Sequence, residues 1–70
     1  MPNMKFVIVN QDNETLFWSG ATKQFQSVVT GIYNRYGNRG IAARIANALV
    51  DRGYRVAVTD LETAKSAAWR

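Results

Sequence analysis

The sequence predicts a small α+β domain, in which a three- to four-stranded antiparallel or mixed sheet carries one helix on one face. Two observations favour this class. Segments 4–10, 15–19 and 54–60 are rich in the Val, Ile and aromatic residues that form strands. Residues 38–53 have the cap signals and apolar spacing of a helix. The expected order is therefore strand, strand, an additional strand, helix and strand.

The first two strand segments predict a hairpin. Residues 4–10 place Met4, Phe6 and Ile8 on one face and Val7 and Val9 on the other, which is typical of a central strand covered on both faces. Asn and Asp dominate the next four positions, and these residues favour turns. The second strand then runs from Thr15 to Ser19.

Residues 20–37 support two interpretations. Phe25, Val29, Ile32 and Tyr36 recur at helical spacing, which predicts a helix ending at Gly37. However, residues 28–33 are rich in strand formers, and a glycine inside a helix costs about 1 kcal/mol. We prefer a strand at 28–33, and the helix remains an alternative.

The helix after this segment has clear boundaries. Asn38 is a natural N-cap, and Gly53 is the expected left-handed stop. The apolar positions that we expect to face the sheet are Ile41, Ala42, Ile45, Ala48 and Leu49. Alternating residues 54–60 predict a half-buried strand. We expect one domain at 1–62, followed by a C-terminal tail at 63–70, in which a helical turn at 63–69 is the alternative.

Composition limits the function. The 70 residues contain no Cys and no His, so we expect no disulfide, no metal and no cofactor. The usual bases and nucleophiles of enzymes are lacking, which favours a non-catalytic protein. Asp60 and Glu62 are interpreted as solvated acids. A chain this short has a thin core, which favours a homodimer. It has no run of 18 apolar residues, and we expect a cytoplasmic protein.

The net charge of +4 is concentrated in the middle of the chain. Arg39 is at the first helical position, Arg35 is close by, and Arg44 lies on the outer helix face. Free amides at a helix start and guanidinium groups attract anions, such as a phosphate or a protein carboxylate. The alternative is that these arginines are merely solvated. Arg52 and Arg55 lie at the far end of the helix segment.

Aromatic residues suggest a binding surface. Phe17 and Trp18 are adjacent in a strand and therefore point to opposite faces. If one helix covers one face, one of the two is left toward solvent or a partner. An exposed aromatic beside arginine is the usual composition of a binding hot spot. The partner-binding residues that we predict are Arg35, Arg39, Arg44, Trp18, Phe17, Tyr36 and Arg55.

The chain resembles a diffuse group of very small phage-encoded accessory proteins. The residues that carry this resemblance are Lys5-Phe-Val-Ile8, Phe17-Trp18, Gly31-Ile-Tyr33, Ile41-Ala-Ala-Arg-Ile-Ala46 and Gly53-Tyr-Arg-Val-Ala-Val58. The loop at 34–39 is longer than in the group's usual pattern. The group shares no catalytic residues. The resemblance implies an accessory role, often that of an inhibitor that binds and blocks a host enzyme or defence complex.

Three hypotheses follow. The first is a non-catalytic phage or mobile-element protein that inhibits a bacterial host or defence complex, for example CRISPR-Cas, by binding an acidic or nucleic-acid-binding surface. The second is a sequence-tolerant nucleic-acid-binding module, whose affinity would fall steeply with salt. The third is a structural or assembly subunit. None of the three involves a membrane.

Overall fold

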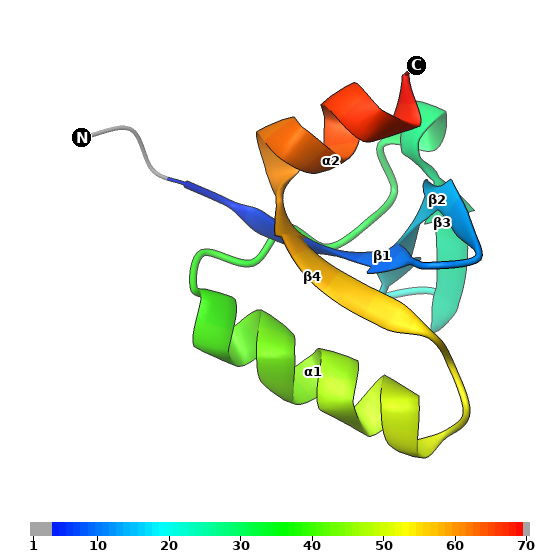
Figure 1. The fold of residues 1–70 in the computed structure, drawn as a ribbon, viewed down its shortest axis with the longest axis vertical. Coiled ribbons are helices and arrows are strands. Elements are labelled where there is room, and N and C mark those ends of the chain that lie inside the picture. Colours follow the sequence, from blue (N-terminus) through cyan, green and yellow to red (C-terminus); the bar gives the residue numbers. More distant parts are fainter. Residues whose placement is uncertain (1–3, 70) are drawn as a thin grey trace.

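The computed structural model describes residues 4–69, which form a four-stranded antiparallel sheet with one helix on each face (Figure 1). The sheet order is β3-β2-β1-β4. The strands are β1 (Phe6–Asn10), β2 (Asn13–Ser19), β3 (Gln24–Ser27) and β4 (Val56–Asp60). The predicted α+β class is confirmed, and so is the hairpin of the first two strands. The second helix lies where we expected a tail with at most a helical turn.

The central strand β1 has a core on both of its faces. Ile8 and Trp18 are buried under helix α1 (Arg39–Asp51). Val7 and Phe17 are buried on the opposite face, under helix α2 (Leu61–Ala68) and a short 3-10 turn, η1. β1 therefore alternates as the sequence predicts, because both layers of the domain pack on it.

The segment after β2 differs from both interpretations of the sequence. The third strand is already complete at Ser27, and η1 (Val28–Thr30) follows it. Gly31 ends this turn in the left-handed region, with φ 69°. The β-branched residues here do not extend a ladder. Instead, Val28 and Tyr33 are buried in the core under α2, while the residues between them turn outward. The expected strand at 28–33 and the alternative helix are both wrong.

The chain then returns to the start of β1 before α1 begins. Tyr36 and Phe6 form an isolated antiparallel bridge, with N···O distances of 2.7 and 2.8 Å in the two directions. This bridge fixes the position of the loop that leads into α1.

The α1 helix begins and ends as predicted. The Asn38 side-chain oxygen accepts hydrogen bonds from the amides of Gly40 and Ile41, at 2.7 and 3.3 Å. At the other end, Gly53 has φ 97°, and the Tyr54 amide donates to the Leu49 carbonyl at 3.0 Å, which is a Schellman motif. The buried residues are Ala42, Ala46 and Leu49. Ile41 and Ala48, which we expected in the core, are exposed.

The predicted C-terminal tail is wrong, because most of it is the helix α2. Asp60 ends β4 and also caps α2, since its Oδ2 accepts a hydrogen bond from the Thr63 amide at 3.1 Å. Ala64 is buried in the core, and Leu61 and Ala68 pack against it. The helix therefore belongs to the same domain as the sheet, beyond the predicted boundary at residue 62. No helix within residues 4–69 is long and apolar enough to cross a membrane.

Candidate protein-binding surface

The arginines that the sequence places near one helix end lie on different faces of the sheet. The Arg35 guanidinium stacks over the Tyr33 ring, 4.3 Å from its centroid, and Tyr33 belongs to the core under α2. The Arg39 guanidinium lies 5.2 Å from the centroid of the Phe6 ring, and Phe6 packs against the core under α1. Each guanidinium therefore covers an aromatic ring of a different layer.

Arg44 and Arg55 are also separate from this pair. Arg44 is exposed on α1 and follows Arg39 by five residues, which turns its side chain by about 140° around the helix axis. Arg55 forms an ion pair with Asp12 at 3.2 Å, between side chains that are 70% and 64% exposed. Such an exposed pair contributes little to stability. The structure thus does not gather the predicted arginines into one anion site.

The predicted aromatic contacts are buried. Phe17 has no exposed surface and meets Tyr33 edge-on, at 4.9 Å between ring centroids. Trp18 is buried under α1 and packs edge-on against Phe25 at 5.2 Å. The expectation that one of the two faces solvent is wrong, because helices cover both faces of the sheet. Tyr36 is half-buried, and this burial raises the pKa of its hydroxyl.

A different aromatic residue has the exposure that we expected of either Phe17 or Trp18. Trp69 follows the last residue of α2, and its side chain is 62% exposed. The adjacent Ala68 packs against the core that also contains Val28 and Tyr33. Figure 1 shows the C-terminal end of α2 beside the η1 turn. The exposed tryptophan therefore lies at the same end of the molecule as η1.

Exposed aliphatic residues lie in the segment around η1, beside which α2 ends. Val29 and Ile32 flank the two core residues of this segment, and both are more than half exposed. Arg35 lies on the ring of Tyr33 in the same core. We call these four residues, Val29, Ile32, Arg35 and Trp69, the Trp69 patch. Tryptophan and arginine, which this patch contains, are among the residue types that are enriched in binding hot spots. The sequence contained this signal only as a tryptophan in a supposed tail.

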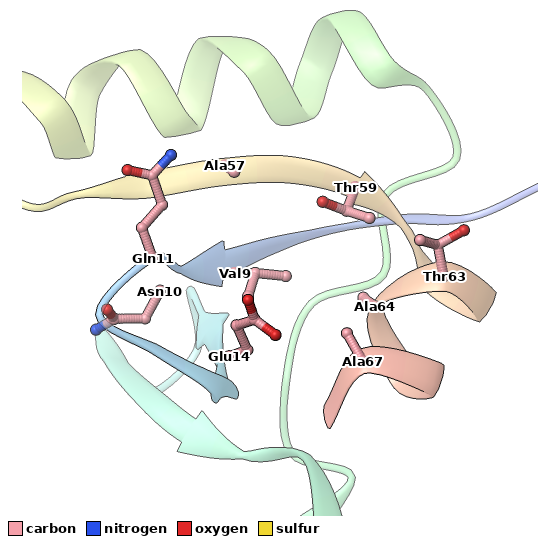
Figure 2. Close-up of a pocket in the computed structure, with 9 residues that line it drawn as sticks. All are labelled: Val9, Asn10, Gln11, Glu14, Ala57, Thr59, Thr63, Ala64 and Ala67. Atoms are coloured by element: carbon pink, nitrogen blue, oxygen red, sulfur yellow. The ribbon is translucent and has the colours of Figure 1, made fainter. Parts of the chain in front are cut away.

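A groove lies beside α2 on the same face of the sheet (Figure 2). Its volume is about 270 Å³, below the range of about 300–1,000 Å³ that is typical of small-molecule sites. Figure 2 shows Thr59 and Ala57 of β4 on one side and Thr63, Ala64 and Ala67 of α2 on the other. The remaining lining residues are Val9, Asn10, Gln11 and Glu14. The groove has room for one or two side chains of a partner.

The acid with a clear structural role is Asp60. Hydrogen bonds from Thr63 lower the pKa of Asp60, and the nearby Arg39 adds a smaller effect in the same direction. Asp60 is therefore an ionised helix cap. Within residues 4–69, the structure brings together no group of three or more acids that could hold a metal ion.

No protein-family model, curated protein or solved structure that was compared with the chain matches it. The function must therefore be argued from the surface of the domain.

Proposed function

We propose that this protein is a small non-catalytic binding protein that attaches to another protein through the Trp69 patch. The observation that carries the proposal is that Trp69, which is 62% exposed, lies at the same end of the molecule as the η1 segment with its two exposed aliphatic side chains and a stacked arginine. Burying an indole and two aliphatic side chains in an interface removes their exposed apolar surface from water, which favours association. A monomer gains nothing from leaving these side chains in water.

The chemistry of the patch indicates the kind of partner. The Arg35 guanidinium stacks on the Tyr33 ring and lies 3.5 Å from the Gly31 carbonyl, and both contacts favour one orientation before binding. A fixed guanidinium loses less entropy when it binds a carboxylate. The partner therefore presents an apolar pocket with a carboxylate at its edge. This agrees with our hypothesis of an acidic or nucleic-acid-binding surface on the target.

The biological setting of the proposal comes from the resemblance to phage accessory proteins. A protein of this kind works in the cytoplasm of a bacterial host, where it inhibits a host or defence complex by occupying its surface. Catalysis is not needed for that role. The absence of Cys and His from the sequence and the use of Asp60 as a helix cap both support a binding role.

The proposal can be tested with the protein as bait in a bacterial lysate. We expect the wild type to recover a protein partner, and Trp69→Ala and Arg35→Ala to recover at least about tenfold less, as for hot-spot residues. Ile41→Ala is the matched control, because Ile41 is 54% exposed on α1, under the other face of the sheet. Equal recovery by Trp69→Ala and wild type would overturn the proposal.

Nucleic acid is the competing partner, and the same samples test it. Arginines that lie on different faces do not form one track for a phosphate backbone, so we expect no gel shift with DNA or RNA at low salt. A shift that weakens steeply as salt rises, together with recovery of nucleic acid alone, would favour the nucleic-acid-binding module instead.

A further inference from the structure

The outer edge of β4 is free. In the sheet order β3-β2-β1-β4, β4 pairs with β1 only, and no other strand within residues 4–69 lies beside it. The Arg55 carbonyl accepts from the Gln11 amide at 2.9 Å, and the Leu61 amide donates to the Lys5 carbonyl at 2.8 Å. Since hydrogen bonding alternates along an antiparallel strand, Val56 and Val58 direct their amides and carbonyls outward.

The two edges of the sheet are protected differently. The edge strand β3 has four residues, two of which are Gln, and it follows Lys23 at a positive φ of 55°. The edge strand β4 reads Val-Ala-Val-Thr-Asp, so its first four residues carry no charge and no Pro. Its register with β1 is continuous from Val56 to Asp60. An apolar, regular edge is a template for another strand.

Small and apolar side chains flank this edge in the α1 layer. Arg39 is the first residue of α1, and its charge helps to lower the pKa of Asp60 at the end of β4, so the start of the helix lies near that end of the strand. Val50 follows Arg39 by eleven residues, within about 20° around the helix, and Ala43 follows by four. Val50 is 52% exposed. Ala43 and Val50 therefore share one side of α1 with Arg39, and the proposal below places this side at the free edge.

In the α2 layer, small side chains also lie next to β4. Thr63 and Ala67 face the groove, together with Ala57 and Thr59 of β4 (Figure 2). None of these four side chains is charged. Apart from Arg39 at the start of α1 and Glu14 in the groove, the side chains named on the two faces are uncharged.

We propose that β4 pairs with β4 of a second copy of this chain, antiparallel and about a two-fold axis at Val58. Adjacent strands lie about 4.8 Å apart, and α1 packs over both β4 and β1. The two α1 axes would then be about 10 Å apart, which is an ordinary helix-packing distance. Ala43 of one copy would meet Val50 of the other.

The second copy suits this surface better than an isolated strand from another protein. A single extended peptide would cover the backbone of β4 but leave Val50 in water. A second copy carries its own helices at the same heights, so it covers both layers. The antiparallel direction also sets Arg55 of one copy beside the Asp60 end of the other, whereas a parallel direction would set Arg55 beside Arg55.

Sedimentation equilibrium over a range of concentrations tests the pairing. We expect the wild type to reach twice its mass of 7.9 kDa. Val58→Pro removes an outward amide, which an edge strand tolerates, and so deletes two intersubunit hydrogen bonds. The dimer dissociation constant should rise at least about thirtyfold. Circular dichroism checks that this variant folds, and a wild-type protein that stays monomeric at all concentrations would overturn the proposal.

A second pair of variants tests the α1 contact without altering the strand. Val50→Glu should weaken the dimer, whereas Ile41→Glu should not, because nine residues place Ile41 about half a turn away on the same helix. The two side chains have matched exposures of 52% and 54%. Trp69→Ala should leave the dimer intact. A dimer that withstands both Val58→Pro and Val50→Glu uses another surface, and the proposal fails.

Amide hydrogen exchange measures the protection of the β4 backbone amides directly and needs no variant. In a monomer, the amides of Val56 and Val58 face water and exchange quickly, while those of Ala57 and Thr59 are protected by β1. In the proposed dimer, all four are protected at high concentration, and the Val56 and Val58 amides lose protection on dilution. Fast exchange of Val58 in a sample that sediments as a dimer would also overturn the pairing.

Discussion

The two helices cover the two faces of one sheet, but they do so to different extents. The α1 helix has 13 residues and buries Ala42, Ala46 and Leu49 against Ile8 and Trp18. The α2 helix has eight residues and fully buries only Ala64. Beside α2 lie the groove and the exposed Trp69. The long helix thus completes the core, whereas the short helix leaves surface on which a partner can pack.

Two adjacent residues of β2 each supply a large aromatic side chain to a different face of the sheet. Trp18 packs under α1 with Phe25 and Tyr54, and Phe17 packs on the other face with Tyr33. Both are buried, so each face has one large aromatic anchor. The difference between the faces therefore lies in the helices and not in the strand beneath them.

The largest expected effect comes from removing an anchor under the long helix. Trp18→Ala should lower the free energy of unfolding by about 3–5 kcal/mol, because it leaves a cavity among α1, Phe25 and Tyr54. Urea denaturation followed by circular dichroism measures this loss. For a domain of this size, the loss is a large share of the total stability.

Trp69→Ala is the matched control for this substitution. The same change of side chain at a 62% exposed position should alter the free energy of unfolding by less than about 0.5 kcal/mol. A loss above about 2 kcal/mol at Trp69 would mean that α2 depends on this indole for its packing. It would then contradict the role of Trp69 as a free binding residue.

The sequence predicts α1 well because its signals are local. Asn38, Gly53 and the apolar spacing between them each indicate a helix without any knowledge of the sheet. Its orientation is less well predicted. The spacing predicts that Ile41 faces the sheet. In the structure Ile41 is exposed, and Ala46 is buried instead. Which residues of α1 face the sheet depends on how the helix packs on the strands, and the sequence pattern of the helix alone does not contain this information.

The α2 helix is hidden in the sequence for a physical reason. Asp60 is both the last residue of β4 and the N-cap of α2, so no loop separates the two elements. The two turns of α2 are rich in Ala, so their buried and exposed sides differ little in hydrophobicity. Packing on the sheet stabilises this helix more than its own propensity does. The Trp69 patch could not be predicted without this helix. The predicted grouping of the arginines is wrong for a related reason, because Arg39 stacks on Phe6 from a distant segment, whereas Arg35 stacks on its neighbour Tyr33 on the other face of the sheet.

A smaller effect is expected at the start of α1. Asn38→Ala removes the oxygen that accepts from two helix amides, and it should lower the free energy of unfolding by about 1 kcal/mol. Thermal and urea denaturation both measure the loss. Asn47→Ala, at an exposed position within the same helix, should be neutral or slightly stabilising, because Ala is the better helix former. Equal losses at both positions would contradict the capping role.

The smallest effect is confined to α2 and distinguishes the two helix caps by pH. Asn38 has no charge to lose, whereas Asp60 caps α2 as a carboxylate whose pKa is lowered by Thr63. The stabilisation of α2 by this cap is therefore complete above the unfolded pKa of about 3.9 and is lost as the pH falls through the lower folded value.

Amide exchange and NMR shifts should show α2 opening in acid while the start of α1 is unchanged. Asp60→Asn keeps a neutral cap and should remove this acid dependence, which separates Asp60 from the neighbouring Glu62. If α2 opened over the same pH range in wild type and Asp60→Asn, the carboxylate would not be the group that holds this helix on the sheet.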